Sequence, residues 1–335
     1  AAVAVHLVFE SGFHSVPRDV QEGLDQLFLV AGEFRNAGVV IPLQAHPALA
    51  FGFNQGAYPF QYFVDVGAGH LQGLVGAQHA VHQAAQAALA DPACQGVIVT
   101  HGTDTLEETA FLLDQTLPAD KPVVVVGAMR PADAVGYDGL RNFANAVRVA
   151  SDPDAAGRGV LVVMGDRVFG ARDVYKVRTR GTEAFRGFPR ESVAIVTPSR
   201  LDWFGAPWRV GDDASLRFLP LPDVPILAVY AGMTATAAAR QLADNPAGIV
   251  VSGLGEGNMP DPVRQISVEH ARRGCLVVRA SRTDEGLVDR EPQDDANGFV
   301  ASRALAPPKA RLLTALLIAN GITEPAEAQR HFDGR

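Results

Sequence analysis

The sequence predicts an α/β fold of two doubly wound domains, a larger one at the N-terminus and a smaller one at the C-terminus. Short runs of valine, isoleucine and leucine indicate buried strands. Segments of helical periodicity alternate with them, which is typical of a parallel sheet covered on both faces. A stretch rich in proline and tryptophan interrupts this alternation once. We therefore expect an N-terminal domain over residues 1–200, a linker over 201–225 and a C-terminal domain over 226–335.

The elements of the N-terminal domain are clearest from residue 96 onward. Buried strands are expected at residues 96–100, 122–126 and 160–164, and helices at residues 106–117 and 140–150. Thr105 and Glu108 have the spacing of a capping box at the start of the first helix, and Pro118 follows its end.

The C-terminal domain repeats the same alternation after the linker. Strands are expected at residues 226–230, 249–252 and 275–279, and helices at residues 235–243, 262–273 and 308–320. The linker itself shows no clear periodicity.

The composition excludes several classes of protein. The chain has 335 residues, of which 47% are hydrophobic and 20% charged, as in ordinary globular proteins. No apolar run reaches the roughly 18 residues that a membrane-spanning helix needs. The net charge of -8 argues against a nucleic-acid surface, which requires a basic patch. Two cysteines cannot form a disulfide framework. The compartment, cytoplasm or periplasm, is left open.

The first 99 residues differ in composition from the rest of the chain. They contain no threonine or lysine, and only 9 of the 66 charged residues. Such a step is usual at a domain boundary or in a low-complexity segment, but here the apolar patterning continues across it. Two hypotheses remain: a diverged N-terminal region, or a stretch that a frameshift has altered.

One loop combines several groups that nucleophilic chemistry requires. Residues 101–105 follow a buried strand and precede a helix, so they lie at the carboxyl edge of the sheet, where doubly wound folds bind ligands. Thr103 offers a hydroxyl and Asp104 a carboxylate beside free amides of the helix N-terminus. Thr105 and Glu108 are explained by capping alone.

A threonine nucleophile needs a base, and Lys176 is the best candidate. The chain has only three lysines. Lys121 precedes a strand at its amino end, and Lys309 begins the last helix. Lys176 follows the strand at 160–164, on the same sheet edge as Thr103. A buried lysine can accept a proton near neutral pH, and a carboxylate such as Asp104 would orient it.

Two other motifs do not support a cofactor or a metal. Residues 253–258 resemble a dinucleotide-binding loop, but Asn258 replaces its third glycine and no acidic residue has the ribose-binding spacing. A tight turn that presents Glu256 and Asn258 to a small ligand is the better interpretation. His79 and His82 have helical spacing without a third ligand. We expect no cofactor and no metal.

These residues resemble those of bacterial type I and type II L-asparaginases and glutaminase-asparaginases. The similarity covers roughly residues 96–335 and is most specific at residues 99–110; further segments carry it. Those segments are residues 126–131, 159–164, 170–176, 253–258, 298–302 and 309–311.

The resemblance implies an asparaginase-like two-domain fold and hydrolysis of the side-chain amide of L-asparagine, with some L-glutamine, without a cofactor. Thr103, Asp104 and Lys176 match a threonine–acid–lysine triad. Thr103 would attack the amide or activate water, Lys176 would be the base, and Asp104 would bind the substrate ammonium and orient Lys176. Asn258 and Glu291 match positions that complete the site from a neighbouring subunit of a homotetramer. Neither nucleic acid nor membrane is an expected partner.

The N-terminal part departs from this family. Members begin with a strand followed by Thr-Gly-Gly-Thr, whose second threonine is the primary nucleophile. Here the strand expected at residues 3–8 precedes no threonine, and Ser11 is the hydroxyl available. The family's Gly-Ser-Gln substrate loop aligns with Gly67, Ala68 and Gly69, without its polar side chains.

Three functions are therefore compared. The first is an amidohydrolase that acts on asparagine. The second is a catalytically impaired amino-acid-binding paralogue of the same fold. The third is an amidase subunit of a tRNA-dependent amidotransferase, which the acidic net charge disfavours.

Overall fold

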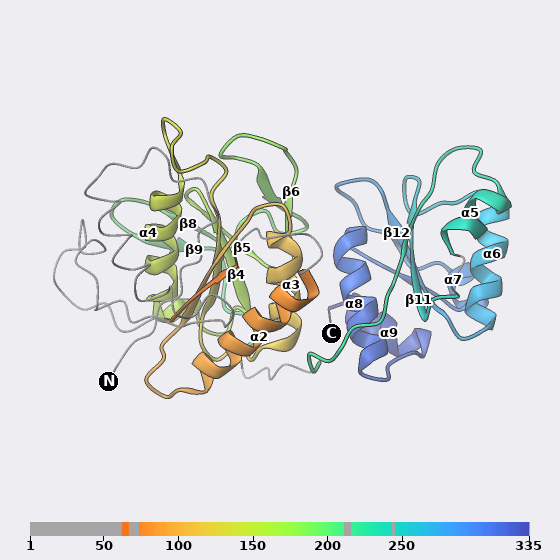
Figure 1. The fold of residues 1–335 in the computed structure, drawn as a ribbon, viewed down its shortest axis with the longest axis horizontal. Coiled ribbons are helices and arrows are strands. Elements are labelled where there is room, and N and C mark those ends of the chain that lie inside the picture. The colour runs from red at the N-terminus through yellow and green to blue at the C-terminus, as the bar shows by residue number, and fades with distance from the viewer. Residues whose placement is uncertain (1–61, 67–73, 211–215, 243–244, 335) are drawn as a thin grey trace. The chain divides into compact units, whose positions relative to one another are not determined.

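A computed structural model of the chain describes residues 62–66, 74–210, 216–242 and 245–334 (Figure 1). They form two compact units that divide after residue 214. Each unit is an α/β structure, as predicted. All the strands and helices predicted between residues 96 and 320 are present, with ends within two residues of the expected ones. The strand expected at residues 3–8 lies outside the described residues.

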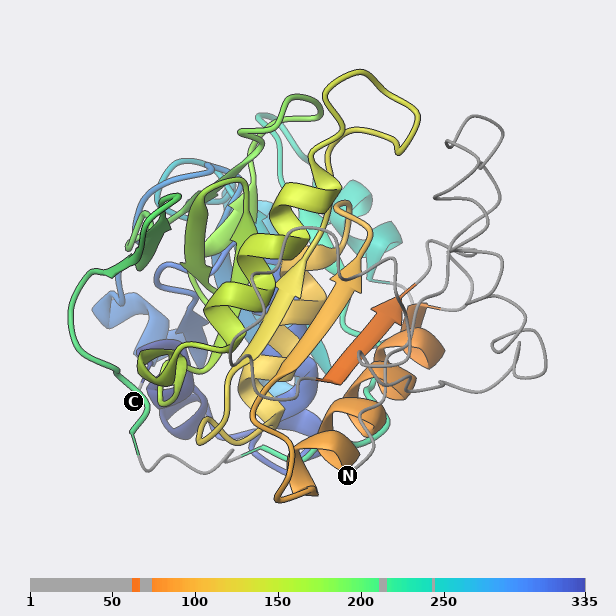
Figure 2. The ribbon, with the colours of Figure 1, turned by 90° about the vertical axis from the view of Figure 1, so that its left-hand side faces the viewer.

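A seven-stranded mixed sheet forms the centre of the N-terminal unit, in the order β1-β2-β3-β4-β5-β8-β9. The first four strands are parallel: β1 (Tyr62–Val66), β2 (Val97–His101), β3 (Val123–Val126) and β4 (Val160–Met164). Figure 2 shows β1, β2 and β3 as neighbouring orange and yellow arrows that point the same way. The other three strands are antiparallel: β5 (Arg167–Gly170), β8 (Ala194–Val196) and β9 (Leu201–Trp203). A separate hairpin pairs β6 (Val174–Lys176) with β7 (Phe185–Gly187).

Helices cover both faces of this sheet. They are α2 (Leu74–Ala90), α3 (Leu106–Thr116) and α4 (Gly139–Ala150), followed by the 3₁₀ turn η5 (Pro153–Ala155). In Figure 1, α4 lies on one side of the strands, and α2 and α3 on the other. The strand side chains alternate accordingly: Val97 and Val99 of β2 pack in the core under α2 and α3, whereas Ile98 packs under α4. The continuous valine runs of the sequence therefore reflect burial on two faces.

The predicted capping box at Thr105 is wrong. The Thr105 side chain makes no capping hydrogen bond, because its backbone (φ -125°, ψ 13°) is not in the extended conformation typical of an N-cap residue. Helix α3 instead begins with backbone hydrogen bonds from Glu108 and Thr109 to the Thr105 carbonyl.

The sheet of the N-terminal unit continues into the range expected to be a linker. Strand β9 pairs with β8, and Trp203 packs against the buried Arg158, whose guanidinium lies 4.2 Å from the ring centroid. Trp208 lies against the same guanidinium at 5.7 Å and against Arg190 at 4.3 Å. These contacts hold residues 201–208 against the N-terminal unit.

The C-terminal unit contains a four-stranded parallel sheet in sequence order. The strands are β10 (Ile226–Ala228), β11 (Gly248–Gly253), β12 (Leu276–Ser281) and β13 (Phe299–Ala301). The helices are α5 (Ala235–Gln241), α6 (Asp261–Arg272), α7 (Pro292–Asn297), α8 (Pro307–Ala319) and α9 (Pro325–Phe332). The core on one face joins β10 and β11 to α5 and α6, and α8 packs against β11 and β12. No helix in the described part of the chain is long and apolar enough to cross a membrane.

Candidate active site

The candidate site lies at the carboxyl end of β2, where the strand gives way to α3. The turn of residues 102–105 joins the two, and it places Thr103 half-buried and Asp104 on the surface. The side chain of Asp104 is 94% exposed. An exposed carboxylate therefore lies beside a partly shielded hydroxyl, in the loop that precedes the N-terminus of α3.

Lys176 reaches this turn from the end of β6. Its Nζ donates a hydrogen bond to Thr103 Oγ1 at 2.9 Å and forms an ion pair with Asp104 Oδ1 at 2.6 Å. The Lys176 side chain is only 16% exposed, so most of its stem is covered. The structure thus brings together the three residues that the sequence singled out on separate strand ends.

Glu107, in the first turn of α3, is a further residue of this site. Its carboxylate accepts a hydrogen bond from the backbone N–H of Lys176. One helix start therefore holds the lysine from two directions, through its backbone and through its ammonium group. Glu107 carries no signal in the sequence for this role, because the contact joins residues 69 positions apart. A carboxylate in the first turn of a helix is usually explained by the helix dipole alone.

The loop that begins at Gly127, after β3, packs against the Thr103 side chain. A Cβ atom at Gly127 would lie 2.8 Å from the carbonyl oxygen of His101 and 3.1 Å from Thr103 Cγ2, so only glycine fits there. The loop is anchored by Asp138, whose carboxylate accepts hydrogen bonds from the backbone N–H groups of Met129 and Arg130 at 3.1 and 3.0 Å. This packing restricts how far the Thr103 side chain can move.

His101, at the end of β2, is not suited to act as the base. Burial lowers its pKa, although a contact between its Nδ1 and the Gly102 carbonyl opposes the shift. The imidazole is 8% exposed, and no contact with Thr103 joins it to the reacting groups of the described site. Lys176 is therefore the base candidate that the geometry supports.

Asn258 and Glu291 lie on the C-terminal unit. Asn258 is exposed and closes a tight loop, since its backbone exchanges two 2.7 Å hydrogen bonds with Leu254. Glu291 precedes α7, and its side chain is 46% exposed. Both residues offer polar groups to solvent at the carboxyl ends of β11 and β12.

Three predicted substrate-binding residues, Ser11, Ala68 and Gly69, lie outside the described residues. In the part of the chain that is described, no group of three or more His, Cys, Asp or Glu side chains is placed to hold a metal ion.

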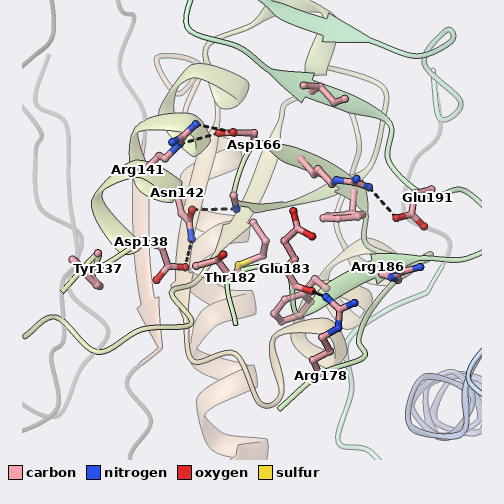
Figure 3. Close-up of a pocket in the computed structure, with 17 residues that line it drawn as sticks. Tyr137, Asp138, Arg141, Asn142, Asp166, Arg178, Thr182, Glu183, Arg186 and Glu191 are labelled. Atoms are coloured by element: carbon pink, nitrogen blue, oxygen red, sulfur yellow. Dashed lines mark hydrogen bonds and ion pairs between the residues drawn. The ribbon is translucent and has the colours of Figure 1, made fainter. Parts of the chain in front are cut away.

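A cavity of about 550 Å³ lies in the N-terminal unit, and none of the predicted site residues lines it (Figure 3). Two ion pairs lie in its walls: Arg141 with Asp166 at 2.7 Å and Arg167 with Glu191 at 2.9 Å. We assign no role to this cavity.

Comparisons with known proteins match both units. The family model "Asparaginase, N-terminal" matches residues 77–209, and "Glutaminase/Asparaginase C-terminal domain" matches residues 223–332. The chain is 39% identical over 245 residues to L-asparaginase 2 of Escherichia coli, covering 71% of this chain and 70% of that protein. It is 38% identical to a probable periplasmic L-asparaginase of Haemophilus influenzae, over 71% of this chain and 70% of that protein. It is 36% identical to a glutaminase-asparaginase of Pseudomonas fluorescens, over 71% of this chain and 67% of that protein.

Proposed function

The chain belongs to the asparaginase family, and on that premise we propose that it hydrolyses the side-chain amide of L-asparagine, and of L-glutamine, to the acid and ammonia. The observation that carries this proposal is the 2.9 Å contact between Lys176 Nζ and Thr103 Oγ1. A hydroxyl in direct contact with an amine is the arrangement that nucleophilic amide chemistry requires.

In the proposed reaction, Thr103 attacks the amide carbonyl or activates a water molecule that does so. Lys176 acts as the base and accepts the proton that the hydroxyl releases, across the 2.9 Å contact between the two groups. That proton then passes to the departing nitrogen, which leaves as ammonia, and water supplies the hydroxyl of the acid. Asp104 fixes the position of the lysine through its 2.6 Å contact.

Charge complementarity supports the choice of substrate. Free asparagine carries an α-ammonium group, and Asp104 presents an almost fully exposed carboxylate next to the reacting pair. Glu291 offers a second, half-exposed carboxylate and Asn258 an amide. We propose that these two residues complete the site from a second copy of the chain within a homotetramer. The Haemophilus relative is named periplasmic, and we propose the periplasm or the cytoplasm for this chain.

A measurement of ammonia release with asparagine and glutamine tests this function. We expect Thr103→Ala and Lys176→Ala each to lower kcat by at least about 100-fold, because each removes one partner of the proton transfer. Two matched controls should leave kcat unchanged. Thr105→Ala alters a residue of the same turn. Lys121→Ala removes a lysine whose ammonium donates to the carbonyls of Leu89 and Asp91. Unaltered turnover in either site variant would overturn the assignment.

An amino-acid-binding paralogue is the second candidate, and one observation favours it. The first 99 residues contain no threonine, although the resembled family carries its primary nucleophile there. Calorimetric titration with asparagine separates the two functions. Heat of binding without any ammonia release identifies the paralogue, whereas sustained ammonia release identifies the hydrolase.

A further inference from the structure

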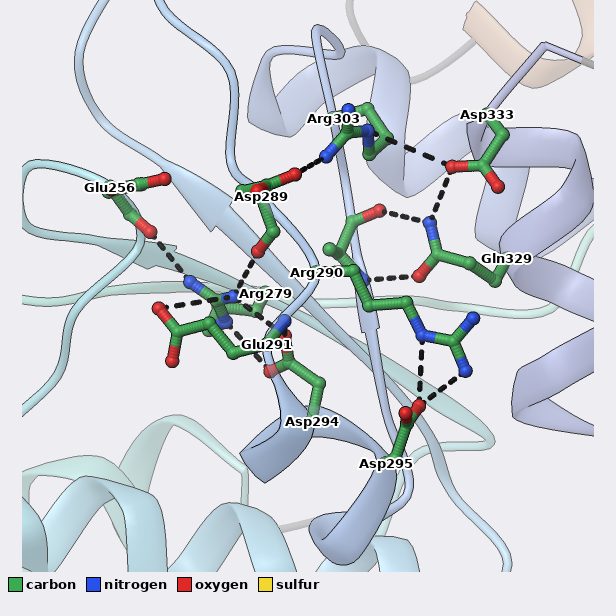
Figure 4. A network of polar contacts seen from close by, with 11 residues as sticks. Glu256, Arg279, Asp289, Arg290, Glu291, Asp294, Asp295, Arg303, Gln329 and Asp333 are labelled. Carbon is green, nitrogen blue, oxygen red and sulfur yellow. Dashed lines mark hydrogen bonds and ion pairs between the residues drawn. The ribbon is translucent and has the colours of Figure 1, made fainter.

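We propose that Arg279 is a positioning residue, whose buried guanidinium holds in place the two segments that carry Asn258 and Glu291. This inference rests on the proposed function, in which those two residues contact the substrate. Arg279 lies on β12 and is 2% exposed. Figure 4 shows its guanidinium at the centre of a network that reaches Glu256, Asp289, Glu291 and Asp294.

The first contact of this network is a two-pronged ion pair. Arg279 Nε donates to Asp294 Oδ1 at 2.8 Å, and Nη2 donates to Asp294 Oδ2 at 2.6 Å. Both side chains are only 2% exposed. A buried pair of this geometry fixes the plane of the guanidinium and therefore the directions of its other N–H groups.

A second contact reaches the loop that ends at Asn258. Arg279 Nη1 donates to the carbonyl oxygen of Glu256 at 2.6 Å. A Cβ atom at Gly257 would lie 3.0 Å from Arg279 Cγ and 3.1 Å from Nη1, so this loop rests directly on the arginine. Gly257 also has φ +83°, which favours glycine. Contact with the arginine therefore fixes the position of this loop, and with it the position of Asn258.

A third set of contacts surrounds Glu291. Arg279 Nη2 donates to the carbonyl oxygen of Asp289 at 2.5 Å and lies 3.8 Å from Glu291 Oε1. The Asp294 carboxylate, already paired with Arg279, accepts the backbone N–H of Glu291 at 2.9 Å. Glu291 is thus fixed through its backbone, and its charge faces the buried cation.

Arg279 makes more hydrogen bonds than an ion pair with Asp294 requires. Asp294 alone would satisfy the charge of Arg279. The remaining donors instead go to two backbone carbonyls, each within two residues of a proposed substrate contact. Lysine cannot replace this arrangement, because its ammonium lacks the planar fork that reaches all these acceptors at once.

Steady-state kinetics of Arg279→Lys test the proposal. We expect KM for asparagine to rise at least ~10-fold while kcat stays within about 3-fold, since the substrate contacts move and the Thr103–Lys176 pair does not. Arg290→Lys is the matched control, because Arg290 pairs with Asp295 on the surface beside Glu291. Its KM should match that of the wild type. A KM for Arg279→Lys within about 2-fold of the wild type would overturn the proposal.

A double-mutant comparison separates positioning from general damage to the unit. In a protein that already carries Asn258→Ala and Glu291→Gln, Arg279→Lys should change KM by less than about 2-fold, because the residues it positions are absent. A full additional 10-fold rise in that background would contradict the role. If Arg279→Lys does not fold, Asp294→Asn, which keeps the arginine but weakens its anchor, undergoes the same comparison. A wild-type protein that releases no ammonia refutes the proposed function itself, whereas an active wild type with an unresponsive KM refutes only the role of Arg279.

Discussion

At the scale of single residues, the position of Lys176 depends on the first turn of α3. Its ammonium contacts Thr103 and Asp104, and its backbone N–H donates to Glu107. Among the described residues, the three-residue strand β6 pairs with β7, and Glu107 ties the end of β6 to the first turn of α3. We expect this tie to help keep the lysine within reach of the hydroxyl.

Glu107→Ala should lower kcat about 10-fold with little change in KM, because a small displacement of the base weakens proton transfer without altering substrate contacts. Ammonia release under saturating asparagine measures the effect. Glu107→Gln, which keeps an acceptor oxygen, should recover most of the activity. Loss of activity in Glu107→Gln equal to that in Glu107→Ala would show that the carboxylate charge acts in some other way.

Lys176 lies in β6 of the separate β6–β7 hairpin, so its contact with Thr103 does not follow from a shared sheet edge. The position of Thr103 at the carboxyl end of β2 could be predicted from the sequence. The roles of Glu107 and Arg279 could not. Each acts through contacts with main-chain atoms far away in the sequence, and backbone groups carry no residue-specific pattern. The buried position of Arg279 also runs against the usual exposure of arginine.

At the scale of elements, Asp114 joins α3 to β4. Its Oδ1 accepts the backbone N–H of Val160 at 2.9 Å and lies 3.2 Å from Arg209 Nη1. A Cβ atom at Gly159 would lie 2.3 Å from the same oxygen, so the glycine makes room for the contact. The carboxylate is 7% exposed.

Asp114→Ala should therefore lower the free energy of unfolding by about 2–4 kcal/mol, because it leaves the buried N–H of Val160 without its acceptor and removes the ion pair with Arg209. Urea unfolding followed by circular dichroism measures the change. The exposed Asp120→Ala is the control and should stay within ~0.5 kcal/mol of the wild type. An Asp114→Ala protein as stable as this control would mean that water replaces the carboxylate.

The long strands and helices could be predicted from the sequence more reliably than the short strands. The valine-rich strands β2, β3 and β4 and the amphipathic helices were predictable because their periodicity records burial. The short strands β5 to β9 were not, since three- or four-residue strands are too short to show alternation, and their pairing depends on distant partners. The start of α3 was predicted correctly, but the capping hydrogen bond of Thr105 was not, because residue spacing alone does not fix backbone conformation.

At the scale of the whole molecule, acid should weaken both units. Burial lowers the pKa of His101 in the N-terminal unit and of His270 in the C-terminal unit. Each therefore takes up its proton at a lower pH in the folded chain than in the unfolded chain, where the pKa is about 6.5. The unfolded state then binds more protons, so stability falls as the pH drops from about 6.5 toward the lowered folded pKa of each histidine.

The free energy of unfolding should accordingly be smaller at pH 5.5 than at pH 7.5. Urea titrations at the two pH values measure the difference. The difference in unfolding free energy between the two pH values should be smaller in the double variant His101→Gln, His270→Gln. In His79→Gln, which replaces an exposed histidine, the difference should match that of the wild type. An undiminished pH dependence in the double variant would assign the effect to other groups.

The stacking of Trp203 and Trp208 on arginine side chains has an optical consequence. These are the chain's two tryptophans, and both belong to the N-terminal unit. Intrinsic tryptophan fluorescence therefore reports the unfolding of the N-terminal unit and does not report that of the C-terminal unit. Ellipticity at the helical wavelength records both units, so a gap between the two traces would show, without any label, that one half of the polypeptide melts before the other.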